Sequence, residues 1–316
     1  MSYYGEPDYG ALRATVEKLA DRLGYAGSPH RNSFMQDYFN ACMGSARRAD
    51  KVVAGLRDLC EQRKAGLPRR TPPEWLAVSE LGQYAFCPAS FAIHRTFEVQ
   101  PSSEMREGDR KHRERLLENW LDSHRAGGRR SGFVSHRESA HGVDDLLKSR
   151  IVHRGHHDDG SEVFFSRNKR LAGSPDYVFE RPDGERFVVE EKHNWSGRMG
   201  RSPHHNHLVQ TLGYVYGLQE HRLSYGYIVY FGHSWLGPAM EAPPRVKLFR
   251  VDRSETNRDI VVSVYRAALK LEESGSEPLD PAAVRPAKCE GCSVAVHCNH
   301  KSGTLREVSV PYPPAS

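Results

Sequence analysis

The residues with the clearest chemical potential are two carboxylates and an amine in the middle of the chain. Asp176 is followed fourteen residues later by Glu190, with Glu191 and Lys192 next to it. The segment 181–184, Arg-Pro-Asp-Gly, lies between them and has the composition of a hairpin turn. A hairpin centred on this turn places Asp176 opposite Glu190, with side chains within about 5 Å of each other. The spacing therefore predicts a carboxylate pair on neighbouring strands.

Strand geometry adds the amine to this pair. Residues two apart on a strand point to the same face, so Glu190 and Lys192 share the face that carries Asp176. Carboxylate oxygens are the ligands that Mg²⁺ and Mn²⁺ prefer. Such an ion polarises a phosphodiester and lowers the pKa of a bound water, while an ammonium group stabilises the developing negative charge. The pattern indicates metal-dependent hydrolysis.

A surface hairpin with an ordinary Glu–Lys ion pair is the alternative, because Asp…Glu-x-Lys alone is a loose pattern. The residues before Glu190 favour the functional interpretation. Residues 187–189, Phe-Val-Val, form an apolar run typical of a buried strand. Charged side chains at the end of a buried strand are costly unless they have a partner or a ligand.

Three further positions are candidate supports for this hairpin. His112 is expected on a long helix, where it is either a further metal ligand or a packed core histidine. Gln210 and Tyr214 are four residues apart and share a helical face, so they either orient a carboxylate or a DNA phosphate, or form a half-buried polar pair. Arg198 and Arg201 precede this helix, and one of them is expected to contact a nucleic-acid backbone.

The six cysteines suggest a second centre. Cys289, Cys292 and Cys298 lie within ten residues, and Cys87 is a distant fourth. Four thiolates are the usual ligand set of zinc or of an iron–sulfur cluster, and the spacing does not distinguish the two. Cys42 and Cys60 are expected to be buried apolar thiols.

The elements that position these residues follow from hydrophobic periodicity. Residues 9–62 are expected to be helical, and residues 64–73 form a proline-bearing linker. Strands alternate with helices beyond this point, which predicts an α/β fold with a mixed central β-sheet flanked by helices. The expected helices are 77–86, 103–126, 204–220 and 254–274, and the expected strands are 162–166, 171–180, 185–192, 223–232 and 245–251.

We expect three parts along the chain: a helical N-terminal lobe with its linker at 1–73, a catalytic domain at 74–306, and a tail at 307–316. Residues 127–160 are rich in Arg, His and Gly and are expected to be an insertion with a short helical patch near 143–149.

Composition sets the class of protein. The chain has 316 residues, 38% of them hydrophobic and 27% charged, with a net charge of +5, which permits a polyanionic partner. We expect no membrane partner, because no run of about 18 apolar residues occurs. The N-terminus has neither a basic n-region nor an apolar h-region, so a cytoplasmic location is expected.

The motifs occur in one order: Cys87-Pro88, Gly-x3-His ending at His112, Pro175-Asp176, Glu190-x-Lys192, Gln210-x3-Tyr214, and Cys289-x2-Cys292-x5-Cys298. This order resembles the RecB-like branch of the PD-(D/E)XK nucleases that carry a four-cysteine iron–sulfur cluster. Within that branch the chain is most similar to the CRISPR-associated exonucleases of the spacer-acquisition machinery. The resemblance covers about residues 78–300 and omits the N-terminal lobe.

The resemblance implies a restriction-endonuclease-like core and a role for each motif. His112, Asp176 and Glu190 would bind Mg²⁺ or Mn²⁺ with the Glu191 carbonyl, Lys192 would be the catalytic lysine, and Gln210 and Tyr214 would contact DNA and support the site. Cys87, Cys289, Cys292 and Cys298 would hold a [4Fe–4S] cluster, with zinc as the rival occupant. The implied activity is an exonuclease on single-stranded DNA ends that processes prespacers beside a CRISPR integrase.

Two other functions are compatible with the same residues. A non-catalytic DNA-binding or scaffold subunit would bind DNA without cleaving it under any divalent metal. A stand-alone repair or mobile-element nuclease would share the chemistry but would lack an integrase gene as neighbour. No Gly-x4-Gly-Lys-Ser/Thr phosphate-binding loop occurs, which separates the chain from helicase–nuclease fusions.

Overall fold

The computed structural model of the protein describes residues 8–101, 103–126, 134–135, 140–155, 162–194, 199–233, 244–278, 288–289, 292–302 and 307–309. The chain forms two compact units. The first unit comprises Met1–Pro72, Cys87–Gln100 and Leu269–Ser316, and the second comprises Pro73–Phe86 and Pro101–Ala268. The catalytic domain expected at 74–306 is therefore divided between the two units.

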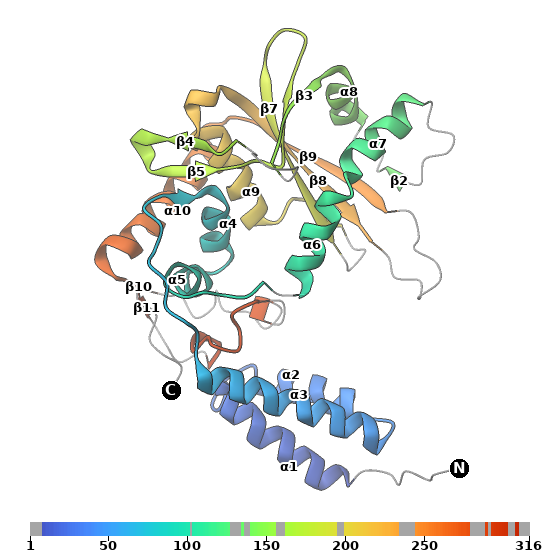
Figure 1. Cartoon of the computed structure of the whole chain (residues 1–316), viewed down its shortest axis with the longest axis vertical. Helices are drawn as coiled ribbons and strands as arrows, with labels where there is room; N and C mark the ends of the chain where they lie inside the picture. Colours follow the sequence, from blue (N-terminus) through green and yellow to red (C-terminus); the bar gives the residue numbers. More distant parts are fainter. Residues whose placement is uncertain are drawn as a thin grey trace. The chain divides into compact units, whose positions relative to one another are not determined.

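A mixed β-sheet forms the centre of the second unit (Figure 1), which agrees with the predicted α/β class. Its strands are β2 (Val134–Ser135), β3 (Arg150–Arg154), β6 (Tyr177–Glu180), β7 (Arg186–Asn194), β8 (Leu223–Gly232) and β9 (Arg245–Val251). The six strands lie in the order β2-β9-β8-β7-β6-β3. β6 pairs antiparallel with β7, which pairs parallel with β8, and β8 pairs antiparallel with β9.

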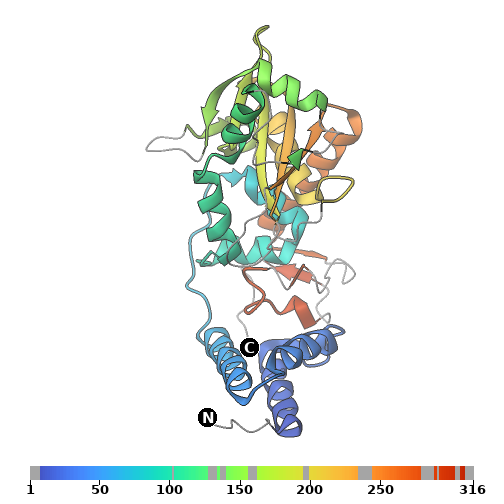
Figure 2. The same ribbon diagram turned by 90° about the vertical axis from the view of Figure 1, so that its right-hand side faces the viewer.

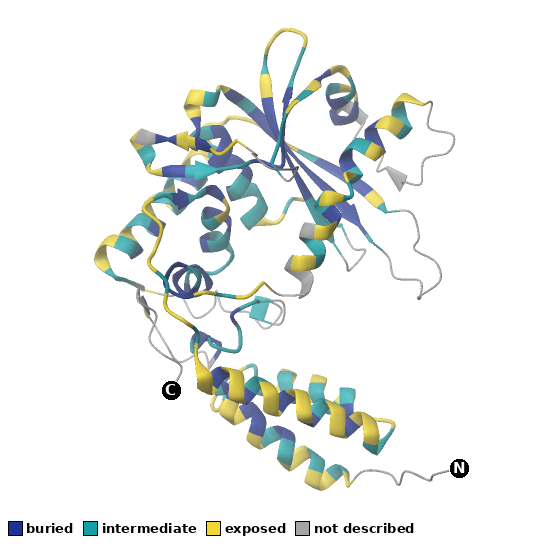
Figure 3. Cartoon of the chain, in the orientation of Figure 1, coloured by how far each residue is buried: buried dark blue, intermediate teal, exposed yellow. Residues whose placement is uncertain are grey.

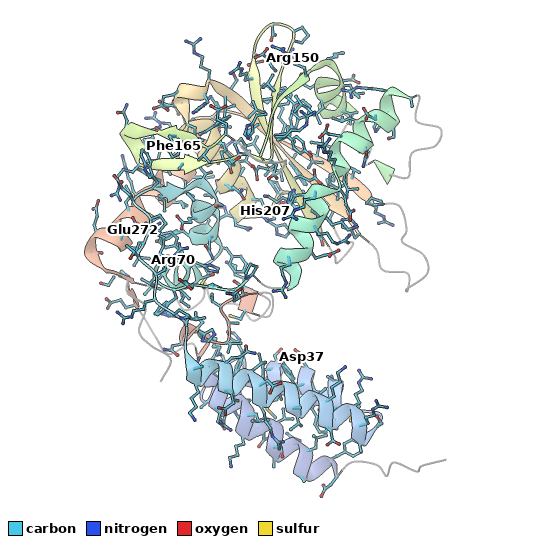
Figure 4. All side chains as sticks on the ribbon, in the orientation of Figure 1. Asp37, Arg70, Arg150, Phe165, His207 and Glu272 are labelled. Carbon is cyan, nitrogen blue, oxygen red and sulfur yellow. The ribbon has the colours of Figure 1, made fainter. Side chains whose placement is uncertain are left out.

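Two sets of helices cover the two faces of this sheet, as the views in Figures 1 and 2 show. One face packs against α7 (Leu116–Arg125) and α8 (Ala140–Lys148), because Trp120 and Leu146 join Phe187 and Val189 in one buried core. The other face packs against α9 (His205–Leu212), whose His207 Nδ1 lies 2.8 Å from the Tyr230 hydroxyl of β8. Figure 4 labels His207 on this helix.

The strands nearest the centre of the sheet are the most buried part of the second unit (Figure 3). The apolar run at 187–189 is fully buried, as its composition predicted. A smaller three-stranded sheet in the order β1-β5-β4 lies in the same unit. Its strands are β1 (Leu76–Ala77), β4 (Phe164–Ser166) and β5 (Leu171–Gly173). This unit also contains α4 (Val78–Phe86), α6 (Ser103–Arg113), η3 (Arg167–Lys169), η4 (Gly213–Gly217), η5 (Gln219–His221) and most of α10 (Glu255–Ser274).

The structure corrects the single helix expected at 103–126. It contains two helices, α6 and α7, separated by Glu114 and Arg115, and Arg115 has a left-handed backbone with φ of 54°. A left-handed residue cannot continue a right-handed helix, so the chain changes direction there.

Two further expectations are corrected. The strand expected at 171–180 is two strands in different sheets, β5 and β6, because Ser174-Pro175-Asp176 separates them and Pro175 has no N–H for a ladder bond. The insertion expected at 127–160 contains β3, which is an edge strand of the main sheet. Its five residues, Arg-Ile-Val-His-Arg, are mostly polar and none is fully buried, so the hydrophobic pattern did not reveal the strand.

The first unit joins the N-terminal helices to the cysteine-bearing segment. α1 (Tyr9–Ala20), α2 (Arg31–Cys42) and α3 (Ala46–Ala65) pack around Val16, Leu19 and Leu56, as the helical periodicity predicted. The Arg63 guanidinium donates to the Val296 carbonyl at 2.7 Å and to the Asn299 side chain at 2.7 Å. The other elements are η1 (Asp21–Tyr25), α5 (Pro88–Thr96), the end of α10 (Glu255–Ser274), β10 (Ser276–Pro278), η7 (His300–Ser302) and β11 (Glu307–Ser309).

The expected tail at 307–316 begins with a strand, because β11 pairs antiparallel with β10, and residues 310–316 lie outside the described part of the chain. Among the described residues, no helix combines the length and the apolar character that a membrane span requires.

Candidate functional site

The hairpin of β6 and β7 has the register that the sequence predicted. Tyr177 pairs with Val189 and Phe179 with Phe187, so the next position along the ladder brings Asp176 opposite Glu190. The Asp176 backbone N–H donates to Glu190 Oε1 at 3.3 Å, and the Glu191 backbone N–H donates to Asp176 Oδ2 at 2.7 Å. Both carboxylates are thus fixed by the backbone of the opposite strand.

The amine of Lys192 completes the predicted trio. Lys192 Nζ lies 2.8 Å from Glu190 Oε2 and 4.0 Å from Asp176 Oδ2. Glu190 has no exposed surface, Asp176 is 5% exposed, and the Lys192 side chain keeps 16% exposure. The trio is therefore a mostly dry group of charges with its amine at the solvent side.

Burial and mutual charge shift the pKa values of these groups. Burial, helped by the nearby Asp176 charge, raises the pKa of Glu190 to about 7 against the opposing effect of Lys192. Burial alone would lower the pKa of Lys192, but the charges of Glu190 and Asp176 outweigh it and raise that pKa. Lys192 is therefore an ammonium at neutral pH and cannot act as a general base, whereas Glu190 exchanges a proton near neutrality.

Gln210 and Tyr214 support this group from the helical side, as their spacing suggested. Gln210 Nε2 donates to Glu190 Oε2 at 2.9 Å, so the same oxygen receives bonds from Lys192 and Gln210. The Tyr214 hydroxyl donates to the Ser174 carbonyl at 3.1 Å. Tyr214 is buried, and burial raises its pKa well above the usual value, so the phenol stays neutral. These contacts orient Glu190 and the chain before Asp176.

His112 lies on α6 with its Nδ1 4.0 Å from Asp176 Oδ2. It therefore reaches the carboxylate group, as a ligand role requires. His112 also belongs to a set of three residues, with Glu191 and His193, whose potential ligand atoms all lie within 4.8 Å of one another. Two of these residues, Glu191 and His193, alternate with Glu190 and Lys192 along β7.

His193 is the residue that sequence reasoning missed. Its signal was present, because Glu191 and His193 are two apart on a strand and so share the face opposite Glu190 and Lys192. His112 was already a candidate ligand in the sequence, but its place beside His193 comes from the packing of α6 against β7.

Of the two arginines predicted to contact DNA, the structure describes only Arg201. Arg201 is exposed, which a contact with a nucleic-acid backbone requires, and that role stays a prediction. Arg198 lies outside the described residues.

The four predicted cysteine ligands gather in the first unit. Burial raises the pKa of Cys289 to about 12, and the charges of Cys298, Cys292 and Cys87 add to this effect. Burial and the charge of Cys298 also raise the pKa of Cys87. These four described cysteines form no disulfide with one another, and Cys289 and Cys292 line a cavity of about 440 Å³. Neighbouring thiolates repel one another, and a bound cation would offset this repulsion. Cys42 and Cys60 are buried in the helical core, as expected.

Comparison with known proteins assigns no family. No protein-family model and no curated protein matches the chain. One solved structure that matches is described as "Crystal structure of SSO0001"; it is 14% identical, with a TM-score of 0.35, and the match covers 78% of this chain and 94% of that chain. A similarity of this degree assigns no activity, so the proposed function depends on the site itself.

Proposed function

We propose that the second unit is a metal-dependent deoxyribonuclease of the PD-(D/E)XK type. The observation that carries the proposal is the meeting of Asp176, Glu190 and Lys192 at the end of the β6–β7 hairpin. Two buried carboxylates, each within 4.0 Å of the same ammonium group, form a donor set suited to a hard divalent cation and to a phosphate group. An ordinary surface pair would leave Glu190 exposed, whereas it has no exposed surface.

The residues divide the work of phosphodiester hydrolysis. Asp176 and Glu190 would hold Mg²⁺ or Mn²⁺, which when bound polarises the scissile phosphate and lowers the pKa of a water. Lys192, permanently charged, stabilises negative charge that develops on the phosphate. Gln210 keeps the Glu190 carboxylate in one orientation through its bond at 2.9 Å.

The substrate and pathway rest on the order of the six motifs. That order supports an exonuclease acting on single-stranded DNA ends, with prespacer processing beside a CRISPR integrase as its role. The net charge of +5 permits a polyanionic substrate. A hydrolysis-deficient DNA-binding subunit is the outcome that the cleavage assay must separate from this proposal.

We also propose that Cys87, Cys289, Cys292 and Cys298 hold a [4Fe–4S] cluster. Burial and the charges of Cys298, Cys292 and Cys87 all act on Cys289, so the four thiols lie near one another. The order of the motifs favours the cluster over zinc, the rival occupant of a four-thiol site. Cys289 and Cys292 also line the cavity of about 440 Å³.

The test measures DNA cleavage by the full chain with Mg²⁺, Mn²⁺ or Ca²⁺. We expect Lys192→Ala and Asp176→Asn to reduce cleavage by about a hundredfold or more. Asn at 176 keeps an acceptor for the Glu191 N–H, so the hairpin is preserved. Lys148→Ala and Asp183→Ala are matched controls, because both residues are exposed and lie outside the trio.

Full activity in both site variants would overturn the proposal. DNA binding without cleavage under every metal would instead identify a scaffold subunit. Circular dichroism of each variant confirms that lost cleavage does not reflect lost fold.

A further inference from the structure

His207 is a histidine near the proposed active site to which the proposed hydrolysis gives no role. It lies on α9 three residues before Gln210, so the two side chains are neighbours on one face of the helix. Gln210 donates to Glu190 of β7, and His207 Nδ1 lies 2.8 Å from the Tyr230 hydroxyl of β8. The same face of α9 therefore presents both residues to the central strands of the sheet.

Tyr230 connects His207 to the lysine of the trio. In the parallel ladder of β7 and β8, Tyr230 is the direct partner of Lys192, so their side chains leave the same face of the sheet next to each other. Burial, followed by the charge of Lys192, lowers the pKa of His207 well below its ordinary value. The imidazole is therefore neutral at pH 7 and lies within the electrostatic reach of the Lys192 ammonium.

The Tyr230 hydroxyl fixes which nitrogen of this neutral ring carries the proton. The His204 backbone N–H donates to the Tyr230 oxygen at 3.1 Å, which leaves the phenolic proton to be donated to His207 Nδ1. Burial raises the pKa of Tyr230 to about 12, so the phenol keeps that proton at neutral pH. A neutral imidazole that accepts at Nδ1 carries its own proton on Nε2, so the hydrogen-bond partners assign the Nε2–H tautomer.

The Nε2–H group of His207 has no acceptor among the residues that the structure describes. The residue is half-buried, and Nε2 is not one of the polar atoms that are shut away from solvent without a partner. The Lys192 side chain likewise keeps 16% exposure. Two donors, one charged and one neutral, are therefore open to a ligand beside the carboxylate pair.

We propose that His207 is a further catalytic residue that donates its Nε2–H to a non-bridging oxygen of the scissile phosphate, with Tyr230 as its positioning residue. The inference rests on the proposed hydrolysis at the trio. A donor already held in one tautomer stabilises the negative charge that develops on the phosphate without reorganising during the reaction. Because the imidazole is neutral, it adds this stabilisation without repelling the Lys192 ammonium.

The test compares two substitutions that each keep one of the two ring contacts. His207→Gln keeps an N–H donor near the position of Nε2, whereas His207→Asn keeps only an acceptor near the position of Nδ1 for the Tyr230 hydroxyl. In cleavage of single-stranded DNA by the full chain with Mn²⁺, we expect His207→Asn to lower kcat about a hundredfold and His207→Gln to stay within about fivefold of wild type.

Two further variants complete the series. Tyr230→Phe leaves the proton of His207 free to occupy either nitrogen, so it should lower kcat by less than His207→Asn does. His205→Asn, at an exposed histidine of the same helix, is the matched control and should cleave as wild type does. Thermal unfolding shows that each variant is folded, and DNA binding in Ca²⁺ separates a weaker complex from a slower reaction.

The outcomes separate this inference from the proposed function. If His207→Gln cleaves no faster than His207→Asn, the Nε2–H group has no part in hydrolysis and the inference is wrong, while loss of cleavage in Lys192→Ala still supports the proposed function. A wild-type protein that does not cleave DNA under any divalent metal contradicts the proposed function, and the inference fails with it.

Discussion

At the scale of single residues, Glu190 has competing demands. It is fully buried, yet it needs its negative charge to bind a metal. The structure supplies Lys192, Gln210 and the Asp176 N–H as three donors to its two oxygens. Even so, burial and the Asp176 charge raise the pKa of Glu190 to about 7, so the metal-free site carries a proton below neutrality.

This shift predicts that Mg²⁺ binding releases a proton in acid and none in base. At pH 6 a group with a pKa of about 7 is about nine-tenths protonated, and at pH 8.5 it is almost fully ionised. Mg²⁺ affinity should therefore rise with pH up to about 7 and then level off. Calorimetry in buffers of different ionisation enthalpy measures the protons released.

The raised pKa of Glu190 also determines how the stability of the metal-free protein changes with pH. Without metal, the folded state holds more protons than the unfolded chain between the ordinary pKa of 4.5 and about 7, so the contribution of Glu190 to stability falls as pH rises through this range. In the Mg²⁺-binding experiment, equal proton release at pH 6 and pH 8.5 would contradict the assignment of Glu190 as the titrating ligand.

At the scale of elements, close contact between α4 and α9 positions Gln210. Gly82 of α4 has no side chain, and a Cβ there would lie 2.9 Å from the Asn206 carbonyl oxygen and 3.3 Å from Gln210 Cβ. The helices can approach this closely because of that glycine, and the approach brings Gln210 within 2.9 Å of Glu190.

Gly82→Ala should therefore push α9 away and weaken the Gln210 bond to Glu190. We expect a loss of about 1–3 kcal/mol in the free energy of unfolding, together with slower metal-dependent cleavage. Chemical denaturation and the cleavage assay measure the two effects. Gly55→Ala is the control, since Gly55 is an exposed helical glycine with nothing within 4 Å of its added Cβ, and it should gain up to about 1 kcal/mol with unchanged cleavage. Identical behaviour of the two variants would remove Gly82 from this role.

At the scale of the whole molecule, the first unit is assembled from distant parts of the sequence. The N-terminal helices, Cys87 and the cysteines near the C-terminus all belong to it. Arg63 and Ser28 bond to the carbonyls of Val296 and Lys301, both at 2.7 Å. The helical lobe that carried no readable chemistry in the sequence thus packs against the segment that presents three of the four thiols.

A cluster that joins Cys87 to Cys289 closes a loop of about 200 residues. By lowering the entropy of the unfolded chain, this closure should stabilise the folded state by about 5 kcal/mol. We therefore predict that Cys87→Ser loses the bound iron and the visible absorbance after anaerobic purification, and that the first unit unfolds at a lower temperature. Cys42→Ala should retain both signals, because Cys42 is buried among apolar side chains of the helical core. Iron analysis and the absorbance spectrum provide the measurement, and a brown Cys87→Ser protein would argue against the four-thiol ligand set.

Local periodicity was enough to predict the hairpin and its register. Asp176 and Glu190 are equidistant from the turn at Asp183, and a two-residue period decides which side chains share a face. The same local logic predicted the buried run at 187–189 and the helices of the N-terminal lobe. These features depend on neighbours close in sequence or on one helix face. The spacing left the role of Gln210 open, and its bond to Glu190 depends on the packing of α9.

Only the tertiary structure decided the remaining features, because they depend on residues far apart in the chain. The packing of α6 against β7 brings His112 close to Glu191 and His193. β3 joins the sheet through pairing with β6, although its own sequence is polar. The N-terminal lobe is placed against the cysteines by hydrogen bonds such as that of Arg63, which no periodic pattern encodes.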